Sequence, residues 1–172
     1  MSRYTIRQVD RLDERDLDGL IEVLIDCVEG GASVSFMHPL SPAKARAFWQ
    51  RIATDIASGA RTLLIAEDDI GVIGTVQIVL DQPENQPHRA DISKMLVHRR
   101  ARRLGVGAAL MTAAEDAARR AGKTLLVLDT ASDDAERLYV RAGWTLAGII
   151  PDYALLPRGG LCATSVYYRK LA

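Results

Sequence analysis

Residues 94–107 read KMLVHRRARRLGVG, a pattern that predicts the end of a strand, a basic loop and the start of a helix. The first N–H groups of a helix have no partner within it and lie at the positive end of its dipole. Gly105 and Gly107 would let the backbone approach an anion closely, because neither carries a Cβ. Arg102 and Arg103 can add charge-assisted hydrogen bonds. The stretch therefore predicts a phosphate or pyrophosphate site.

The usual nucleotide-binding fingerprints do not fit these glycines. A Rossmann loop requires G-x-G-x-x-G, but Leu110 stands at the third glycine position, and no Gly-Lys-Ser/Thr of a Walker loop follows. The basic run contains no aromatic residue, and the chain balances 22 Lys and Arg against 22 Asp and Glu, so a nucleic-acid surface is not expected. From the residues alone, a plain strand-to-helix turn with a solvated basic run stays open as an alternative.

Hydrophobic periodicity predicts further elements on both sides of this stretch. Strands are expected at 4–9, 62–66, 71–80, 90–97, 124–128, 144–150 and 163–171. Helices are expected at 13–29, from Pro42 to Gly59 with Ser41 as N-cap, at 105–121 and at 132–142. Pro151, Pro157 and Gly159-Gly160 indicate a loop before the last strand. The order β-α-α-β-β-β-α-β-α-β-β predicts an α+β fold, a mixed, mostly antiparallel sheet flanked by helices, in a single domain over residues 1–172.

Composition adds expectations about the compartment and about metals. The N-terminus lacks a signal-peptide pattern, and no apolar run approaches the roughly 20 residues that span a bilayer, so we expect a cytoplasmic protein away from membranes. Cys27 and Cys162 are too far apart for a zinc pattern and are expected to be buried, reduced thiols. The three histidines show no ligand spacing, so no metal is expected.

Two motifs resemble those of the GNAT superfamily of N-acetyltransferases. Arg102–Gly107 is similar to its signature R/Q-x-x-G-x-G/A. SDDAERLYVRAGW, residues 132–144, is similar to the family's short helix, in which Ser132 replaces the usual Asn. The motifs lie about 30 residues apart, as a helix-strand-helix unit requires. The resemblance implies acetyl-CoA as co-substrate, and it implies a homodimer because homodimers are frequent in the superfamily.

Further segments resemble the tabtoxin resistance protein branch of this superfamily, over nearly the whole chain. They are EGGASVSFM (29–37), AEDD (66–69), HRADISKMLV (88–97), LDT (128–130) and TSVYYRKL (164–171). This likeness implies a small-molecule primary amine as acceptor, amino-acid-like in character, such as a toxin or an antibiotic.

The resemblance also implies which residues hold the cofactor. The loop amides would bind the pyrophosphate of coenzyme A, and the backbone of the preceding strand would bind the pantetheine. Ser132 would contact the pantetheine or adenine side. The residues concerned are Leu96, Val97, Arg102, Arg103, Leu104, Gly105, Val106, Gly107, Ala108 and Ser132.

Acetyl transfer to an amine needs a neutral nucleophile, charge stabilisation at the acetyl oxygen and protonation of the leaving thiolate. Tyr139 falls where the family has its general acid. An alkylammonium has a pKa near ~10, so a base must remove a proton. Asp91 in the cofactor strand and Asp129 at the end of the neighbouring strand are the candidates, although each could be an edge or cap carboxylate. A backbone N–H near Leu96 or Val97 is the oxyanion donor that the resemblance implies.

The segment between the first two helices covers the acceptor pocket in this superfamily. Here it offers Ser33, Val34, Phe36 and Met37, and Tyr153 in the late loop is a further candidate for acceptor contact. A simple hydrophobic joint between two helices is the alternative for this segment.

Two other functions stay open at this point. An open, acidic acceptor groove would favour acetylation of a protein N-terminus or lysine, whereas a closed apolar pocket would count against it. A non-catalytic acyl-CoA-binding regulator is the other, and the presence of Tyr139 and two candidate carboxylates counts against that one.

Overall fold

The computed structural model describes residues 4–171 as seven strands, four α-helices and one 3-10 turn. In chain order the elements are β1 (Thr5–Val9), α1 (Glu14–Glu29), α2 (Pro42–Ala57), β2 (Arg61–Glu67), β3 (Val72–Val79), β4 (Arg89–Val97), η1 (Arg99–Ala101), α3 (Val106–Arg120), β5 (Leu125–Thr130), α4 (Asp133–Arg141), β6 (Thr145–Leu155) and β7 (Leu161–Lys170).

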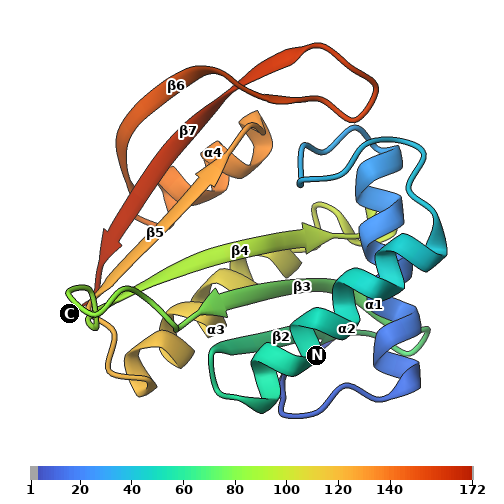
Figure 1. Cartoon of the computed structure of the whole chain (residues 1–172), viewed down its shortest axis with the longest axis horizontal. Helices are drawn as coiled ribbons and strands as arrows, with labels where there is room; N and C mark the ends of the chain where they lie inside the picture. The colour runs from blue at the N-terminus through green and yellow to red at the C-terminus, as the bar shows by residue number, and fades with distance from the viewer. Residues whose placement is uncertain (1–3, 172) are drawn as a thin grey trace.

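The strands form one sheet in the order β1-β2-β3-β4-β5-β7-β6 (Figure 1). Every neighbouring pair is antiparallel except β4 and β5, which run parallel. The α+β layout and the order of the elements predicted from the sequence are therefore confirmed.

Side chains cap the first residues of α1 and α2, and the cap of α2 is Ser41, as the sequence predicts. The side chain of Asp13 accepts from Asp16 N at 2.8 Å, and that of Ser41 accepts from Lys44 N at 3.2 Å. Each bond satisfies one of the N–H groups that a helix start leaves without a partner. Pro42 follows Ser41 at the first helical turn, where its missing N–H costs nothing.

Helices cover both faces of the β1–β4 half of the sheet. α3 packs on one face, where Leu64, Ile78 and Leu110 are among the buried residues. α1 and α2 cover the other face and bury Leu20 and Trp49 there. Full burial of an apolar side chain of this size stabilises the folded state by about 1.5–3 kcal/mol. This half of the sheet is therefore a stable scaffold for the loops at its edge.

The last hairpin is longer than the sequence predicts. β6 continues past Ile150 to Leu155, and its register against β7 shifts between Ile150 and Ala154. Pro151 is tolerated because β6 is the edge strand and the shift is a bulge, where no ladder N–H is needed. The expected loop over residues 151–160 is therefore wrong in its first half, and Tyr153 lies in a strand.

The two cysteines differ in burial. Cys27 is a buried free thiol, as predicted, but Cys162 on β7 is half-buried, because the end of the β6–β7 hairpin lies outside the core. No helix within residues 4–171 has the length and apolar character needed to cross a membrane.

Candidate active site

The parallel strands β4 and β5 separate soon after they meet. Their pairing runs from Arg89↔Leu125 to Asp91↔Val127 and then ends (Figure 1). On its other side β4 stays paired with β3, with a register shift between Thr75 and Gln77. Beyond Asp91, the edge of β4 that faces β5 has no paired strand, so its backbone groups are open to a ligand.

A cavity of about 370 Å³ lies at this split. Its walls come from the α1–α2 connection, the middle of β4, the end of β5 with α4, and the β6–β7 hairpin. All of the residues expected to contact the acceptor line it, together with the expected acid and one of the two expected carboxylates. They are Ser33, Val34, Phe36, Met37, Tyr153, Tyr139 and Asp129.

The α1–α2 connection is bound to the tip of the β6–β7 hairpin. His38 N donates to Pro157 O at 2.8 Å, and Arg158 Nη1 donates to Glu29 O at 3.0 Å. Val34 and Phe36 also pack against the core beneath α1 and α2. The segment is thus a hydrophobic joint between two helices and a wall of the cavity at the same time.

Tyr139 projects from α4 into the cavity wall. It is 4% exposed, and its ring lies 5.9 Å from that of Trp144 and 6.0 Å from that of Tyr167. Burial, with a smaller contribution from the negative charge of Asp129, raises the pKa of the Tyr139 hydroxyl well above its usual range. The hydroxyl therefore keeps its proton at neutral pH and well into the alkaline range.

The two candidate carboxylates have different surroundings. Asp129 lines the cavity from β5, and its Oδ2 accepts from Thr164 Oγ1 at 2.8 Å, which orients the carboxylate. Asp91 is not among the lining residues; it forms an ion pair with Arg89 and accepts from Gln82 Nε2 at 3.3 Å. The sequence predicted that Asp91 would reach the gap between β4 and β5, and this prediction is wrong. Arg89 and Gln82 hold the Asp91 carboxylate away from the gap.

Lys94 is a cavity residue that the sequence reasoning did not single out. Its Nζ donates to Ser35 Oγ at 3.2 Å and lies 5.8 Å from the centroid of the Phe48 ring. Burial lowers the pKa of the Lys94 ammonium, although the charge of Asp129 opposes that shift. In the sequence Lys94 is one of four polar residues of β4, with Arg89, Asp91 and Ser93, so the pattern alone did not distinguish it.

The basic loop leads into α3 with a backbone suited to an anion. Gly105 is the N-cap at φ +82°, and no side chain within residues 4–171 caps this helix start. Arg102, Arg103 and Leu104 are exposed in front of it. A Cβ at Gly107 would lie 3.0 Å from Met95 Cε and 3.3 Å from a methyl of Leu138, so glycine is needed for the approach of α3 to its neighbours.

Contacts to α1 hold the loop in place. Asp26 accepts from Arg99 N at 2.8 Å and from Arg99 Nε at 2.7 Å. Burial by itself would raise the pKa of Asp26, but these two hydrogen bonds outweigh it and lower that pKa. Arg99 is thereby committed to the scaffold, whereas Arg102 and Arg103 stay exposed at the helix start.

A split between parallel strands beside an uncapped, glycine-bearing helix start is the architecture of an acyl-CoA-dependent acyltransferase. Residues 27–144 match the model of the Acetyltransferase (GNAT) family, and the chain belongs to this family. It is thus an acetyl-CoA-dependent N-acetyltransferase. No cluster of three or more metal-ligating side chains occurs in the described part of the chain.

Known proteins are similar to this chain at low sequence identity. An uncharacterized N-acetyltransferase from the hisH-hisA intergenic region of Azospirillum brasilense is 27% identical over 131 residues, 75% of this chain and 76% of the relative. A Salmonella typhimurium protein solved with its cofactor acetyl-CoA superposes with a TM-score of 0.78 at 21% identity, covering 99% of this chain and 95% of that one. A phosphinothricin acetyltransferase of Sinorhizobium meliloti, solved in complex with acetyl-CoA, superposes with a TM-score of 0.81 at 21% identity. The match covers 99% of this chain and 89% of that one.

Proposed function

We propose that this enzyme acetylates the primary amine of a small, amino-acid-like molecule, in the manner of a toxin- or antibiotic-modifying enzyme. The observation that carries the proposal is the cavity of about 370 Å³ at the strand split, which is in the size range of small-molecule sites. Phe36 and Met37 give this cavity apolar surface, while Asp129 and Lys94 give it one charge of each sign.

Acetylation of a protein N-terminus or lysine fits this cavity less well. The bonds from His38 N to Pro157 O and from Arg158 to Glu29 O join the two segments that would have to part for a polypeptide. The cavity also has a lysine in its wall, whereas an acidic groove would suit a basic peptide. A free small molecule requires no such opening.

The residues at the helix start fit the pyrophosphate of coenzyme A. The first N–H groups of α3 are left without a side-chain cap, and Gly105 leaves room for an anion to approach the backbone, because a Cβ there would have only the Tyr4 hydroxyl within 4 Å. We assign the pyrophosphate to Arg102, Arg103, Leu104, Gly105, Val106, Gly107 and Ala108, and the pantetheine to the backbone at Leu96 and Val97 and to Ser132.

Acetyl-CoA supplies the acetyl group, and the residues of this chain handle the protons. Asp129 orients the acceptor ammonium and receives its proton, directly or through a water molecule. The amine nitrogen then forms a bond to the acetyl carbon while the bond from that carbon to sulfur breaks. A backbone N–H of β4 near Leu96 or Val97 stabilises charge on the acetyl oxygen, and Tyr139 gives its proton to the departing sulfur. The acetylated nitrogen loses its second proton, which restores the Tyr139 hydroxyl directly or through a water molecule.

A screen for thiol release from acetyl-CoA tests this function. The purified protein is offered amino acids, polyamines, aminoglycosides and peptides, and the free thiol of coenzyme A is measured over time. We expect release with amino-acid-like amines and none above background with peptides. Release with peptides alone would favour the protein acetyltransferase, and cofactor binding without release for any amine would favour the regulator.

β6 supports a second part of the proposal, that two copies of this chain associate. All but one of its residues are exposed, and the apolar ones include Leu146, Ile149, Ile150 and Leu155. The strand has a single charged residue, Asp152, and its outer edge has no partner strand among the described elements. An apolar antiparallel edge can meet its own copy across a two-fold axis, so we assign this edge to a homodimer.

Replacing Ile149 with lysine is expected to dissociate this dimer. Ile149 is 61% exposed, and two buried charges would face each other across the two-fold axis. Light scattering after gel filtration should give about twice 18.8 kDa for the wild type and one copy for the variant. Ile70→Lys in the β2–β3 turn is the control and should stay dimeric, because Ile70 is 84% exposed and three strands of the sheet separate β3 from β6. A monomeric wild type or a dimeric Ile149→Lys protein would refute the assignment.

A further inference from the structure

Lys94 places a positive charge in the acceptor cavity, and no carboxylate of the described residues lies within ion-pair distance of it. None of the ion pairs among residues 4–171 includes it, and its Nζ hydrogen-bonds only to the neutral hydroxyl of Ser35, at 3.2 Å. By contrast, Arg61 nearby is committed to Asp55 and Gln77. Partial burial of a charge without a counterion is unfavourable, so an anion arriving in the cavity would be attracted to this ammonium.

The backbone holds Lys94 in this position against its own preference. Lys94 has φ +48° and its hydrogen-bond partner Ser35 has φ +76°, both in the left-handed region that disfavours residues with a side chain. Lys94 sits at the register shift of β4 against β3, and such bulges re-aim a side chain. Backbone conformations of this kind persist where the surrounding structure enforces them, and they cluster at ligand sites.

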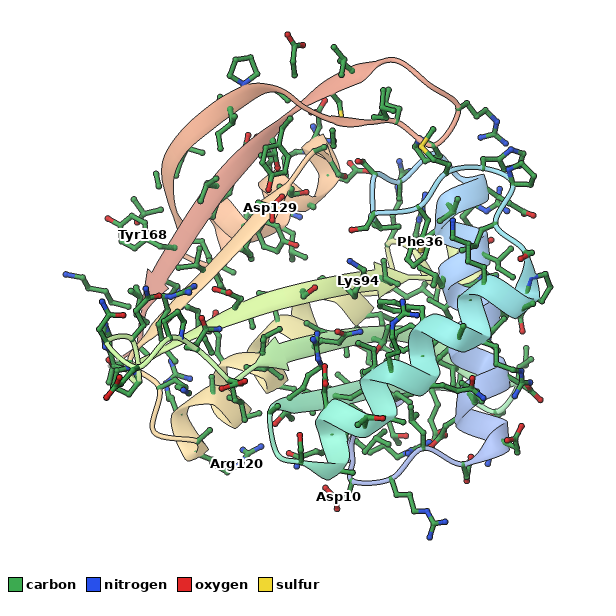
Figure 2. All side chains as sticks on the ribbon, viewed as in Figure 1. Asp10, Phe36, Lys94, Arg120, Asp129 and Tyr168 are labelled. Carbon is green, nitrogen blue, oxygen red and sulfur yellow. The ribbon has the colours of Figure 1, made fainter. Side chains whose placement is uncertain are left out.

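The opposite charge lies across the gap. Figure 2 places Lys94 on β4 and Asp129 on β5, on the two sides of the strand split, with Phe36 of the α1–α2 connection at its end. All three residues line the cavity. We propose that Lys94 binds an anionic group of the acceptor, such as a carboxylate, while the amine of the same molecule lies at Asp129.

This inference deepens the proposed function and rests on it. A molecule with an ammonium and a carboxylate would satisfy Asp129 and Lys94 together, whereas a simple amine would leave the lysine without a counterion. Burial is the main cause of the lowered pKa of Lys94, and an anion bound beside the ammonium would oppose that shift because it favours the charged form. Lys94 is therefore expected to decide between acceptors rather than to transfer protons.

Matched acceptor pairs test the role of Lys94. L-methionine and L-methioninamide, and L-lysine and L-lysinamide, differ in the carboxylate alone, and the amide has the more easily deprotonated α-amine. A charge-assisted hydrogen bond at a partly buried site is equivalent to about 10–100-fold in affinity. We expect the wild type to prefer the acid of a pair by at least about tenfold in kcat/KM, mainly through KM, despite the lower reactivity of its amine.

Lys94→Met removes the charge and keeps the length of the side chain, and Lys94→Gln is a second variant in case the first does not fold. In either, the acid-to-amide ratio should fall toward one, with acetyl-CoA affinity retained. Lys44→Met is the matched control: Lys44 is exposed on α2, with its Nζ 6.0 Å from the Phe36 centroid, but it does not line the cavity. That variant should keep the wild-type ratio.

Calorimetry with the same compounds separates this inference from the proposed function. If amines are acetylated but the acid-to-amide ratio is the same in the wild type and in both Lys94 variants, the function holds and the role of Lys94 is refuted. If no amine is acetylated, the proposed function fails; binding of the acids to the wild type but not to the Lys94 variants would then still support the anion site. Equal binding of acid and amide, or no binding of either, would refute it.

Discussion

Tyr139→Phe is expected to lower kcat for acetyl transfer by about 10²–10⁴-fold, the usual contribution of a positioned general acid. The substitution removes one hydroxyl from the cavity wall and keeps the ring that packs on Trp144 and Tyr167. Folding and acetyl-CoA affinity should therefore be retained. Because the pKa of the wild-type hydroxyl is raised, mainly by burial, the acid stays protonated as pH increases, and wild-type kcat should show no alkaline decline below pH ~10.

Tyr167→Phe is the matched control for this substitution. The Tyr167 ring lies 6.0 Å from the Tyr139 ring, but its hydroxyl donates to Glu136 Oε2 at 3.3 Å and does not line the cavity. Removing that hydroxyl changes the same aromatic cluster without touching the proposed acid, so kcat should stay within about threefold of the wild type. Thiol release under saturating acceptor measures both variants. Equal kcat values for Tyr139→Phe and wild type would remove Tyr139 from the mechanism.

The second large effect concerns the helix start. Gly105→Ala is expected to weaken acetyl-CoA binding by at least about tenfold, because a Cβ at this point separates the pyrophosphate from the N–H groups of α3. The φ of +82° makes alanine unfavourable by about 1–2 kcal/mol in folding as well. The nearest atom to the added Cβ would be the hydroxyl oxygen of Tyr4 at 3.7 Å, so the fold itself has room for it.

Gly122→Ala separates the two effects of that substitution. Gly122 follows the other end of α3 at φ +75°, with nothing within 4 Å of a Cβ, so it carries nearly the same backbone penalty far from the loop. Chemical denaturation should show similar losses of stability for the two variants, whereas calorimetry should show weaker acetyl-CoA binding for Gly105→Ala alone. Wild-type affinity in Gly105→Ala would contradict the assignment of the pyrophosphate to this loop.

Most of the fold could be predicted from the sequence because its signals are local. Ser41-Pro42 marks a helix start by a hydrogen bond within one turn, and the apolar runs of β2 and β3 are separated by a short acidic turn. The length of β6 was predicted too short because proline usually ends a strand. Pro151 is tolerated here because β6 is an edge strand, and its place at the edge depends on the packing of the other strands.

The site was predicted unevenly for the same reason. The glycine loop and Tyr139 belong to compact motifs, so their positions follow from spacing along the chain. Asp91 and Asp129 looked alike, and the difference comes from partners brought together by folding: Arg89 and Gln82 for the first, Thr164 for the second. Lys94 could not be assigned from sequence, because its exposure to the cavity depends on a bulge in β4 that no local pattern specifies.

A crystal structure of the protein with acetyl-CoA tests most directly where the cofactor binds. We expect the pyrophosphate to accept hydrogen bonds from the backbone N–H groups around Gly105 and Gly107. We expect the thioester to lie in the gap between β4 and β5, with the Tyr139 hydroxyl within hydrogen-bond distance of its sulfur. A pyrophosphate bound away from this helix start, or a thioester outside the cavity that Asp129 and Tyr139 line, would refute both the cofactor site and the role of Tyr139.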